Sequence, residues 1–382
     1  MKRWLQKNGI RLLRAGSLLL CLPLVYVFAA LTFPFVEPAL SKAAVFSAGL
    51  SYPVDARNAA QAFDGSVSQQ EPQALEDPDA AMLEPAGDPA EDGEASSAGN
   101  LDTPAESVPE DIPAKPDNAG TVIRKTYEPG TGTVYIKTGE GYIKNCTSIG
   151  ADKVKAAAAQ PPKFKIQTSG EPQVLIMHTH ATESYQQYQV DWYDKSLGTR
   201  TTDTAKNVCR VGDEIAEQLE AAGIGVIHDR TLHDYPSYNG SYERSAVTVK
   251  KILKENPSIK VVLDVHRDAI QNDANTMTAP VTTIDGKSCA QVMIISGCDD
   301  GTMNMPNYME NLKFSAALQR TMAEDYPTLA RPILFDYRKY NQDLTTGSIL
   351  LEVGGHANTL DEAVYCGELV GKSLAETLLG LQ

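Results

Sequence analysis

The second half of the chain has the pattern of an α/β domain in which a mostly parallel sheet is flanked by helices. Short apolar runs alternate with amphipathic stretches of helical period, as strands and helices do in βαβ units. The helical stretches end at residues that stop helices, such as Gly223 and Pro257. Polar clusters follow the apolar runs, at the strand ends that form the ligand crevice of an open α/β sheet. The sequence therefore predicts an α/β domain over residues 166–382.

The N-terminus has the pattern of a membrane anchor. Residues 15–36 carry no charge and are long enough to span a bilayer. The segment 1–14 is basic, which keeps it in the cytoplasm and places the rest of the chain on the other side. We predict a single-pass anchor in the cell membrane with an extracytoplasmic domain. A cleaved signal peptide is the alternative, since Ala29 and Ala30 are small residues near a possible cleavage point.

An acidic linker is predicted over residues 37–120. From residue 51 onward it is rich in Asp, Glu, Pro, Ala, Gly and Ser, so it cannot bury enough apolar surface to offset the entropy of ordering. Residues 51–120 hold 16 acidic and two basic side chains, which accounts for −14 of the net charge of −15. The remainder is close to neutral, and nothing in it supports nucleic-acid binding.

The elements after the linker follow in a definite order. Short alternating runs broken by Gly predict a small β-rich lobe over residues 121–165. A hairpin is predicted over residues 279–297, with Asp285 and Gly286 as its turn. The other predicted elements are strands at 173–177, 225–228, 259–266, 333–335 and 348–353, and helices at 201–222, 242–255, 308–324 and 361–379.

The cysteines have no close spacing of the kind that clamps a zinc ion. Cys21 lies in the expected span, and five others follow it: Cys146, Cys209, Cys289, Cys298 and Cys366. We expect scattered buried thiols. A disulfide between Cys289 and Cys298 across the hairpin is the alternative.

Metal-ligand residue types gather at the ends of predicted strands. His178, His180 and Glu183 follow the strand at 173–177, and His266 ends the strand at 259–266. A catalytic zinc ion commonly has three protein ligands, such as two histidines and a carboxylate, and a fourth coordination position that is open for water. Such a zinc lowers the pKa of its water toward neutrality. Glu352, on a further strand, is placed to act as a general acid and base.

Neighbouring polar residues have weaker patterns. His228 and His233 lie in a long polar loop, where substrate contact or loop structure is favoured over metal binding. Asp264 and Asp268 flank His266, and such carboxylates commonly orient a ligand imidazole. Neither a His-Glu-x-x-His helix nor a Gly-x-Ser-x-Gly turn is present.

Four blocks resemble the stage II sporulation protein P family of endospore-forming bacteria: VLIMHTHATESY, HDYPSYNGSYERS, VVLDVHRDA and LLEVGGHANTLDEA. The resemblance extends from about residue 121 to the C-terminus and implies a fold similar to the zinc-dependent N-acetylmuramoyl-L-alanine amidases. In those amidases a Glu-x-Gly-Phe-x-x-Asn stretch carries the catalytic glutamate. Glu352, Gly354 and Asn358 match this spacing, with Gly355 in place of the Phe.

The resemblance also implies roles for the site residues. It favours His178, Glu183 and His266 as zinc ligands, Glu352 as the catalytic acid and base, and His180 as a polar group near the water or substrate. The first block departs from the amidase pattern of a single His followed by glycines, so the choice between His178 and His180 stays open.

The implied activity is cleavage of the amide between N-acetylmuramic acid and L-Ala in peptidoglycan, with peptide cross-links as a further target. The implied setting is the mother-cell septal membrane during engulfment, with stage II sporulation proteins D and M as partners. A non-catalytic wall-binding scaffold and a zinc peptidase that acts on proteins are the alternatives.

Overall fold

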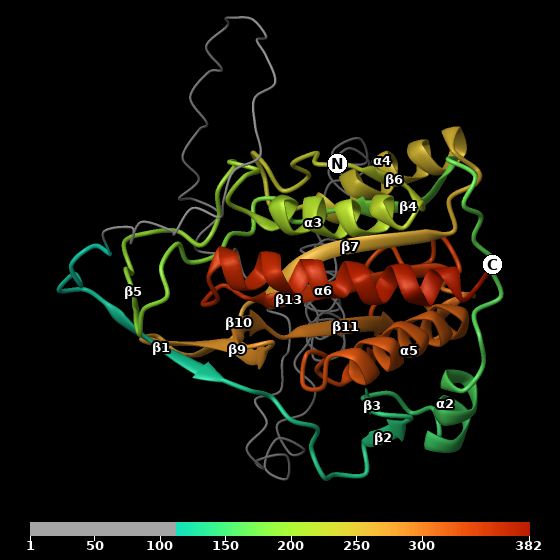
Figure 1. The fold of residues 1–382 in the computed structure, drawn as a ribbon, viewed down its shortest axis with the longest axis horizontal. Helices are drawn as coiled ribbons and strands as arrows, with labels where there is room; N and C mark the ends of the chain where they lie inside the picture. The colour runs from blue at the N-terminus through green and yellow to red at the C-terminus, as the bar shows by residue number, and fades with distance from the viewer. Residues whose placement is uncertain (1–111) are drawn as a thin grey trace, which may run out of the picture. The chain divides into compact units, whose positions relative to one another are not determined.

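The computed structural model describes residues 112–382 of the chain (Figure 1). The expected span at 15–36 and nearly all of the expected linker lie outside the described residues. Within residues 112–382, no helix combines the length and the apolar character needed to cross a membrane. The anchor therefore stays a prediction.

An eight-stranded sheet forms the centre of the described part, in the order β2-β3-β12-β11-β13-β7-β4-β6. Strands β13, β7, β4 and β6 are mutually parallel, whereas β11 runs antiparallel to β13. The prediction of a mostly parallel sheet is therefore wrong, because the hairpin insertion returns β11 in the opposite direction and makes the sheet mixed. The strands are β2 (Tyr135–Thr138), β3 (Gly141–Asn145), β4 (Pro172–Met177), β6 (Gly225–His228), β7 (Val261–Asp268), β11 (Val292–Gly297), β12 (Ile333–Asp336) and β13 (Gly347–Gly355).

A smaller sheet has the order β10-β9-β1-β5, with β8 paired to β9. Its turn between β9 and β10 has φ of 49° at Asp285 and 77° at Gly286, which confirms the predicted hairpin. The strands of residues 121–165 are divided between the two sheets: β1 pairs with β9, and β3 pairs with β12. The bounds are β1 (Gly120–Lys125), β5 (Trp192–Tyr193), β8 (Gln271–Asp273), β9 (Thr276–Ile284) and β10 (Lys287–Ala290).

Helices cover both faces of the large sheet. The main core joins α3, α5 and α6 to one face, and these three helices lie side by side in Figure 1. The other face packs on α4, whose Val249 belongs to one apolar cluster with Leu175, Met177 and Val262. The helices are α2 (Ala151–Ala158), α3 (Val208–Ala221), α4 (Ser241–Glu255), α5 (Tyr308–Asp325) and α6 (Leu360–Leu379).

Two helix boundaries differ from the sequence prediction. Helix α3 begins at Val208 rather than near 201, because the Asn207 side chain accepts the N–H of Cys209 and caps the helix there. Helix α2 was not predicted from the sequence and follows Gly150. The five cysteines in the described part of the chain are free. Cys209, Cys289, Cys298 and Cys366 are buried as expected, whereas Cys146 is exposed.

Strand alternation decides which polar residues share a face. In β7, Val261, Leu263 and Val265 belong to the core under α3, α5 and α6. The intervening side chains of Asp264 and His266 therefore point to the α4 face. Polar groups thus collect on the α4 side, at the carboxyl end of β7.

Candidate metal centre

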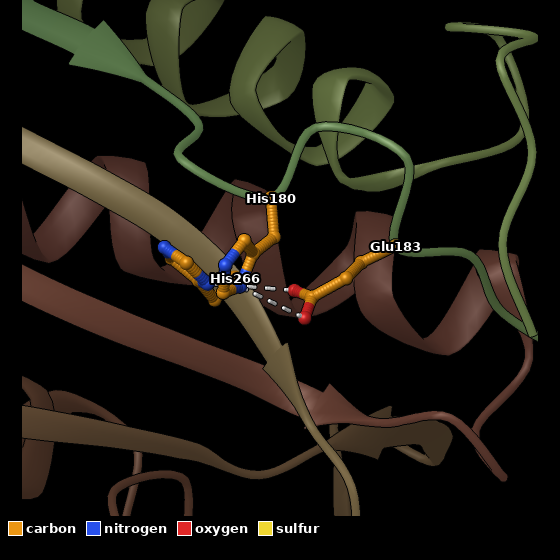
Figure 2. Close-up of side chains that lie close together, drawn as sticks. All are labelled: His180, Glu183 and His266. Carbon is orange, nitrogen blue, oxygen red and sulfur yellow. Dashed lines mark ion pairs between the residues drawn. The ribbon is translucent and has the colours of Figure 1, made fainter. Parts of the chain in front are cut away.

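His180, Glu183 and His266 form a buried group at the ends of β4 and β7 (Figure 2). The first two lie on the loop that leaves β4, and the third lies in β7. Nδ1 of His180 is 3.7 Å from Oε1 of Glu183, and Nδ1 of His266 is 3.5 Å from Oε2 of the same carboxylate. Each of the three residues is at most 5% exposed. Both imidazoles therefore direct the same nitrogen at one carboxylate.

The donor set and its spacing fit a zinc ion. Zinc binds His nitrogen and carboxylate oxygen at about 2.1 Å, so two ligands of a tetrahedral site lie roughly 3.4 Å apart. The observed separations of 3.5 and 3.7 Å run to different oxygens of Glu183, and the three donor groups lie within 4.8 Å of one another, so a bound ion would draw the donors closer together. Two histidines and one glutamate also leave one position for water, as catalytic zinc sites do.

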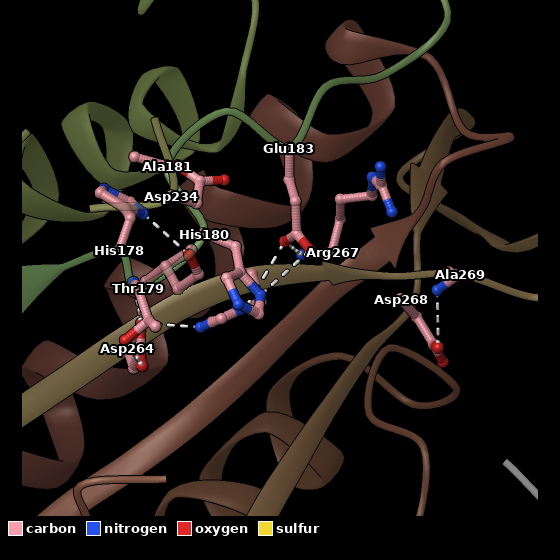
Figure 3. A network of polar contacts seen from close by, with 12 residues as sticks. His178, Thr179, His180, Ala181, Glu183, Asp234, Asp264, Arg267, Asp268 and Ala269 are labelled. Carbon is pink, nitrogen blue, oxygen red and sulfur yellow. Dashed lines mark hydrogen bonds and ion pairs between the residues drawn. The ribbon is translucent and has the colours of Figure 1, made fainter. Parts of the chain in front are cut away.

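Outer contacts hold the two imidazoles in this orientation. Nε2 of His180 lies 3.1 Å from Oγ of Ser241, and Nε2 of His266 lies 2.8 Å from Oδ1 of Asp264. The Asp264 carboxylate in turn accepts the backbone N–H of Thr179 at 2.8 Å and its hydroxyl at 2.7 Å (Figure 3). A partner on the far nitrogen fixes the tautomer and ring direction of a ligand histidine. Asp264 thus has the orienting position expected from the sequence.

The charges around the group keep Glu183 ionised. Burial alone raises its pKa, but hydrogen bonds from His180 and His266, with the charge of Arg267, hold the pKa of Glu183 well below its usual value. The backbone N–H of Arg267 donates to Oε2 at 3.0 Å, and the guanidinium of Arg200 lies 3.6 Å from Oε1. The group therefore presents an anionic oxygen ligand.

His266 carries a matching positive charge. Burial lowers its pKa, but the carboxylates of Asp264 and Glu183 raise the pKa of His266 well above its usual value. A cation is thus favoured between these carboxylates, and a bound metal ion would take the place of the imidazole proton.

Glu352 lies beside His266 on the neighbouring strand. The two residues are register partners in the parallel pairing of β13 with β7, so their Cα atoms are roughly 5 Å apart. Leu351 belongs to the core under α3, α5 and α6, so Glu352 points to the same α4 face as His266. The Tyr185 hydroxyl donates to the carbonyl of Val353 at 3.0 Å, which ties the loop carrying Glu183 to this part of β13.

His178 lies outside the group, contrary to the expected ligand set. Its Nδ1 is 2.8 Å from the carbonyl of Val265, and its Nε2 is 2.8 Å from Nε2 of His228. Ile176 belongs to the core under α3, so the side chain of His178, two residues later, turns to the α3 face. In the structure, therefore, His180 belongs to the candidate metal-binding group, and His178 lies outside it in a supporting position.

The His178–His228 pair is packed against α3. Burial lowers the pKa of His178 to about 3 and that of His228 to about 4, so both rings are neutral at pH 7. A Cβ atom at Gly212 would lie 2.6 Å from one ring and 2.8 Å from the other, so any larger residue there would displace the rings. Nδ1 of His233 lies 3.1 Å from the carbonyl of His178. Within the described contacts, His228 and His233 support the loop, as the sequence favoured.

Two further residues of the site had no clear pattern in the sequence. Arg200 forms a buried ion pair with Asp234 at 3.0 Å and lies over the ring of Tyr238. Tyr238 stacks on His180 with ring centroids 4.6 Å apart. Arg200 belongs to a polar loop without periodicity, so only the fold reveals its place.

The stretch after Glu352 is held by side-chain hydrogen bonds. Oδ1 of Asn358 accepts the N–H of Gly355 at 2.8 Å, and its Nδ2 donates to Glu362 at 3.1 Å. Gly354 has φ of 68°, which favours glycine. Asp268 ends β7 and pairs with Arg331 at 2.8 Å, which gives it a structural partner of its own.

The fold and the site together define a mixed α/β protein with a buried two-histidine, one-carboxylate group of the kind that holds a catalytic metal. Sequence comparison places the chain more narrowly. It belongs to the Stage II sporulation protein P (SpoIIP) family, whose model matches residues 99–375. Stage II sporulation protein P of Bacillus subtilis (strain 168) is 34% identical over 220 residues, which cover 54% of this chain and 50% of that protein. The chain thus spans about half the length of this curated relative.

Solved structures of amidases have a weaker likeness to the chain. The CwlD amidase from Clostridioides difficile, in complex with the GerS lipoprotein, is 13% identical with a TM-score of 0.35 and covers 55% of this chain and 100% of its own. The N-acetylmuramoyl-L-alanine amidase from Clostridium difficile 630 is 16% identical with a TM-score of 0.32 and covers 56% and 97%.

Proposed function

We propose that the chain is a zinc-dependent peptidoglycan hydrolase that acts as an N-acetylmuramoyl-L-alanine amidase. In this proposal His180, Glu183 and His266 hold the zinc, and Glu352 is the general acid and base. The observation that carries it is the buried His180–Glu183–His266 group with Glu352 in register beside His266. Membership of the SpoIIP family supports peptidoglycan as the substrate.

The chemistry divides between the metal and the side chains. A bound zinc ion supplies Lewis acidity toward the amide carbonyl and lowers the pKa of a water molecule. Glu352 accepts a proton from the attacking water and delivers it to the nitrogen of the leaving L-Ala, so the C–N bond breaks without a net gain of charge. Arg267 and Arg200 keep Glu183 ionised through this cycle.

The wider setting belongs to the same proposal. Hydrolysis of peptide cross-links is a second reaction, since it also breaks an amide. We further propose that residues 15–36 anchor the chain in the mother-cell septal membrane and that it works with stage II sporulation proteins D and M. The support for this setting is the basic and apolar N-terminal sequence together with family membership.

Purified peptidoglycan tests the proposal directly. The full-length chain, purified in a mild detergent, is incubated with the wall with and without a zinc chelator, and the products are identified by mass spectrometry. We expect free stem peptides, lost with the chelator and in Glu352→Gln, but retained in Glu324→Gln, which removes an exposed carboxylate from α5.

Other outcomes distinguish the alternatives. Release of uncrosslinked muropeptides identifies the second activity. An intact wall that still retains the protein supports a non-catalytic scaffold. Cleavage that persists in Glu352→Gln contradicts the assigned acid and base.

A further inference from the structure

Two adjacent residues in the loop before β13 have a backbone conformation that L-amino acids rarely adopt. Tyr340 has φ of 41° and Asn341 has φ of 54°. Asn tolerates the left-handed region, whereas Tyr does so much less readily. Such strain persists only where surrounding contacts fix the chain, and it concentrates at functional sites. The contacts of these two residues lead to both histidines of the candidate metal centre.

A chain of polar contacts begins at Asn341. Its Nδ2 donates to the carbonyl of Tyr242 at 2.9 Å and to the hydroxyl of Ser245 at 3.0 Å. The Ser245 hydroxyl lies 2.9 Å from that of Thr179, which donates to Asp264 at 2.7 Å. Asp264 is the carboxylate that faces His266. The side-chain amide of Asn341 is thus linked to the candidate ligand His266 through three intervening side chains.

The donors along this chain point in one direction. The Thr179 hydroxyl donates its proton to Asp264, so its oxygen is the acceptor in the 2.9 Å contact with Ser245. The Ser245 proton is shared between this contact and the carbonyl of Tyr242 at 3.2 Å, and the Ser245 oxygen accepts from Asn341. Hydrogen bonds arranged head to tail polarise one another. Their combined effect strengthens the hold on the Asp264 carboxylate and, through it, the orientation of His266.

A chain of aromatic contacts begins at Tyr340. Its ring stacks on Tyr242 with centroids 5.2 Å apart, and Tyr242 meets His180 edge to face at 5.4 Å. Tyr242 is in the first turn of α4, next to Ser241, which holds Nε2 of His180. The loop therefore reaches His180 through packing, and it reaches His266 through hydrogen bonds followed by the ion-pair contact with Asp264.

We propose that Thr179, Ser245 and Asn341 are positioning residues for zinc, acting on His266 through Asp264. This inference rests on the proposed function, because it requires that the group binds zinc. Removing the Thr179 hydroxyl leaves a buried Asp264 oxygen without its partner and allows the carboxylate to turn from His266. Zinc affinity therefore falls most at Thr179 and least at Asn341, which is farthest from the ligand.

Zinc affinity of the full-length chain tests this order. The protein is stripped of metal with a chelator, and zinc is titrated against a competing chelating dye. Outer partners of metal ligands contribute about 10–100-fold to affinity, so we expect about a tenfold loss in Thr179→Val and recovery in Thr179→Ser, which restores the hydroxyl. The visible spectrum of bound Co²⁺ should change in Thr179→Val and return in Thr179→Ser.

A matched pair of variants tests the far end of the chain. Asn341→Gly removes the amide while glycine retains the backbone conformation, and we expect a loss of about threefold in zinc affinity. Asn304→Gly makes the same substitution at an exposed residue with φ of 55° and should leave the affinity unchanged. Thermal melting of the metal-free variants identifies any that fail to fold.

The outcomes separate the two proposals. A wild-type chain that binds no zinc overturns the proposed function and the positioning role together. A wild-type chain that binds zinc, with folded Thr179→Val and Asn341→Gly variants of equal affinity, overturns the positioning role alone. Equal losses in Asn341→Gly and Asn304→Gly would also overturn it, since they would show a general effect of the substitution.

Discussion

Gly212 provides a sharp test of the packing beneath the candidate centre. Glycine is about 1 kcal/mol less favourable than alanine in a helix interior, so Gly212→Ala in α3 would stabilise an unobstructed helix. Here the new Cβ would lie 2.6 Å from Nε2 of His228 and 2.8 Å from Nε2 of His178. Ordinary contacts between such atoms begin at about 3.5 Å, so both buried rings must move by most of an ångström.

The size of the effect follows from these opposing contributions. Overpacking of a core costs about 1–3 kcal/mol, and the gain in helix propensity offsets about 1 kcal/mol of it. We expect Gly212→Ala to lower the free energy of unfolding by about 1 kcal/mol, or the melting temperature by about 2–4 °C for a domain of this size. Thermal and urea unfolding of the metal-free protein measure the change.

A double-mutant cycle with His228→Ala identifies the cause. Removal of the His228 ring creates room for the Cβ and lets His178 shift, so Gly212→Ala should be neutral or stabilising in that background. The expected interaction energy is about 1 kcal/mol, in the range found for residues in contact. A higher melting temperature for Gly212→Ala in the wild-type background would refute the reasoning.

Three further predictions concern the metal and Glu362, whose carboxylate forms a capping box with Thr359 at the start of α6. His180→Ala should abolish tight zinc binding, whereas His178→Ala should retain one bound zinc per chain. Equilibrium dialysis with metal analysis measures the bound zinc in both variants. The reverse result would indicate His178 as the ligand. Saturating zinc should raise the melting temperature of the metal-free chain, because a ligand that binds only the folded state stabilises it; no shift would count against a folded-state site. Burial raises the pKa of Glu362, but the hydrogen bond from Ser288 and the charge of Arg124 lower that pKa below 4.5 overall. The ionised carboxylate therefore stabilises the fold above pH 4.5, and this stabilisation is lost as the pH falls through the pKa of Glu362 in the folded state. The stability difference between wild type and Glu362→Gln should therefore shrink below pH 4.5, and a constant difference across pH would contradict this assignment.

The sequence predicts the large elements because their signals are local. Strand β7 begins with three consecutive apolar residues, Val261–Leu263, and the Asp285–Gly286 turn has the residue types that its positive φ values require. The antiparallel direction of β11 has no such local signal, because it depends on where the hairpin returns across the sheet. The division of β1 and β3 between two sheets is likewise set by distant partners.

The sequence predicts the kinds of ligand in the candidate site, but it does not show which of the two histidines after β4 belongs to the group. The residue types alone indicated Glu183 and His266 as candidate ligands. The alternation of side chains along a strand, which places Asp264 and His266 on one face of β7, also applies to β4. Ile176 and His178 fall on the α3 face by that rule, opposite His266, so alternation could have excluded His178. His180 lies beyond the strand, where no periodic rule applies and only the path of the loop decides its position.

The pairing of β1 also determines how the fold responds to tension on the preceding chain. Any pull through the residues before 112 enters the described part at β1, its first strand. Five consecutive residues of β1, from Thr121 to Lys125, are in parallel register with β9. A force along the strand would shear these pairs together instead of opening them one at a time. The β1–β9 pairing should therefore resist tension along the strand better than it resists peeling from one end.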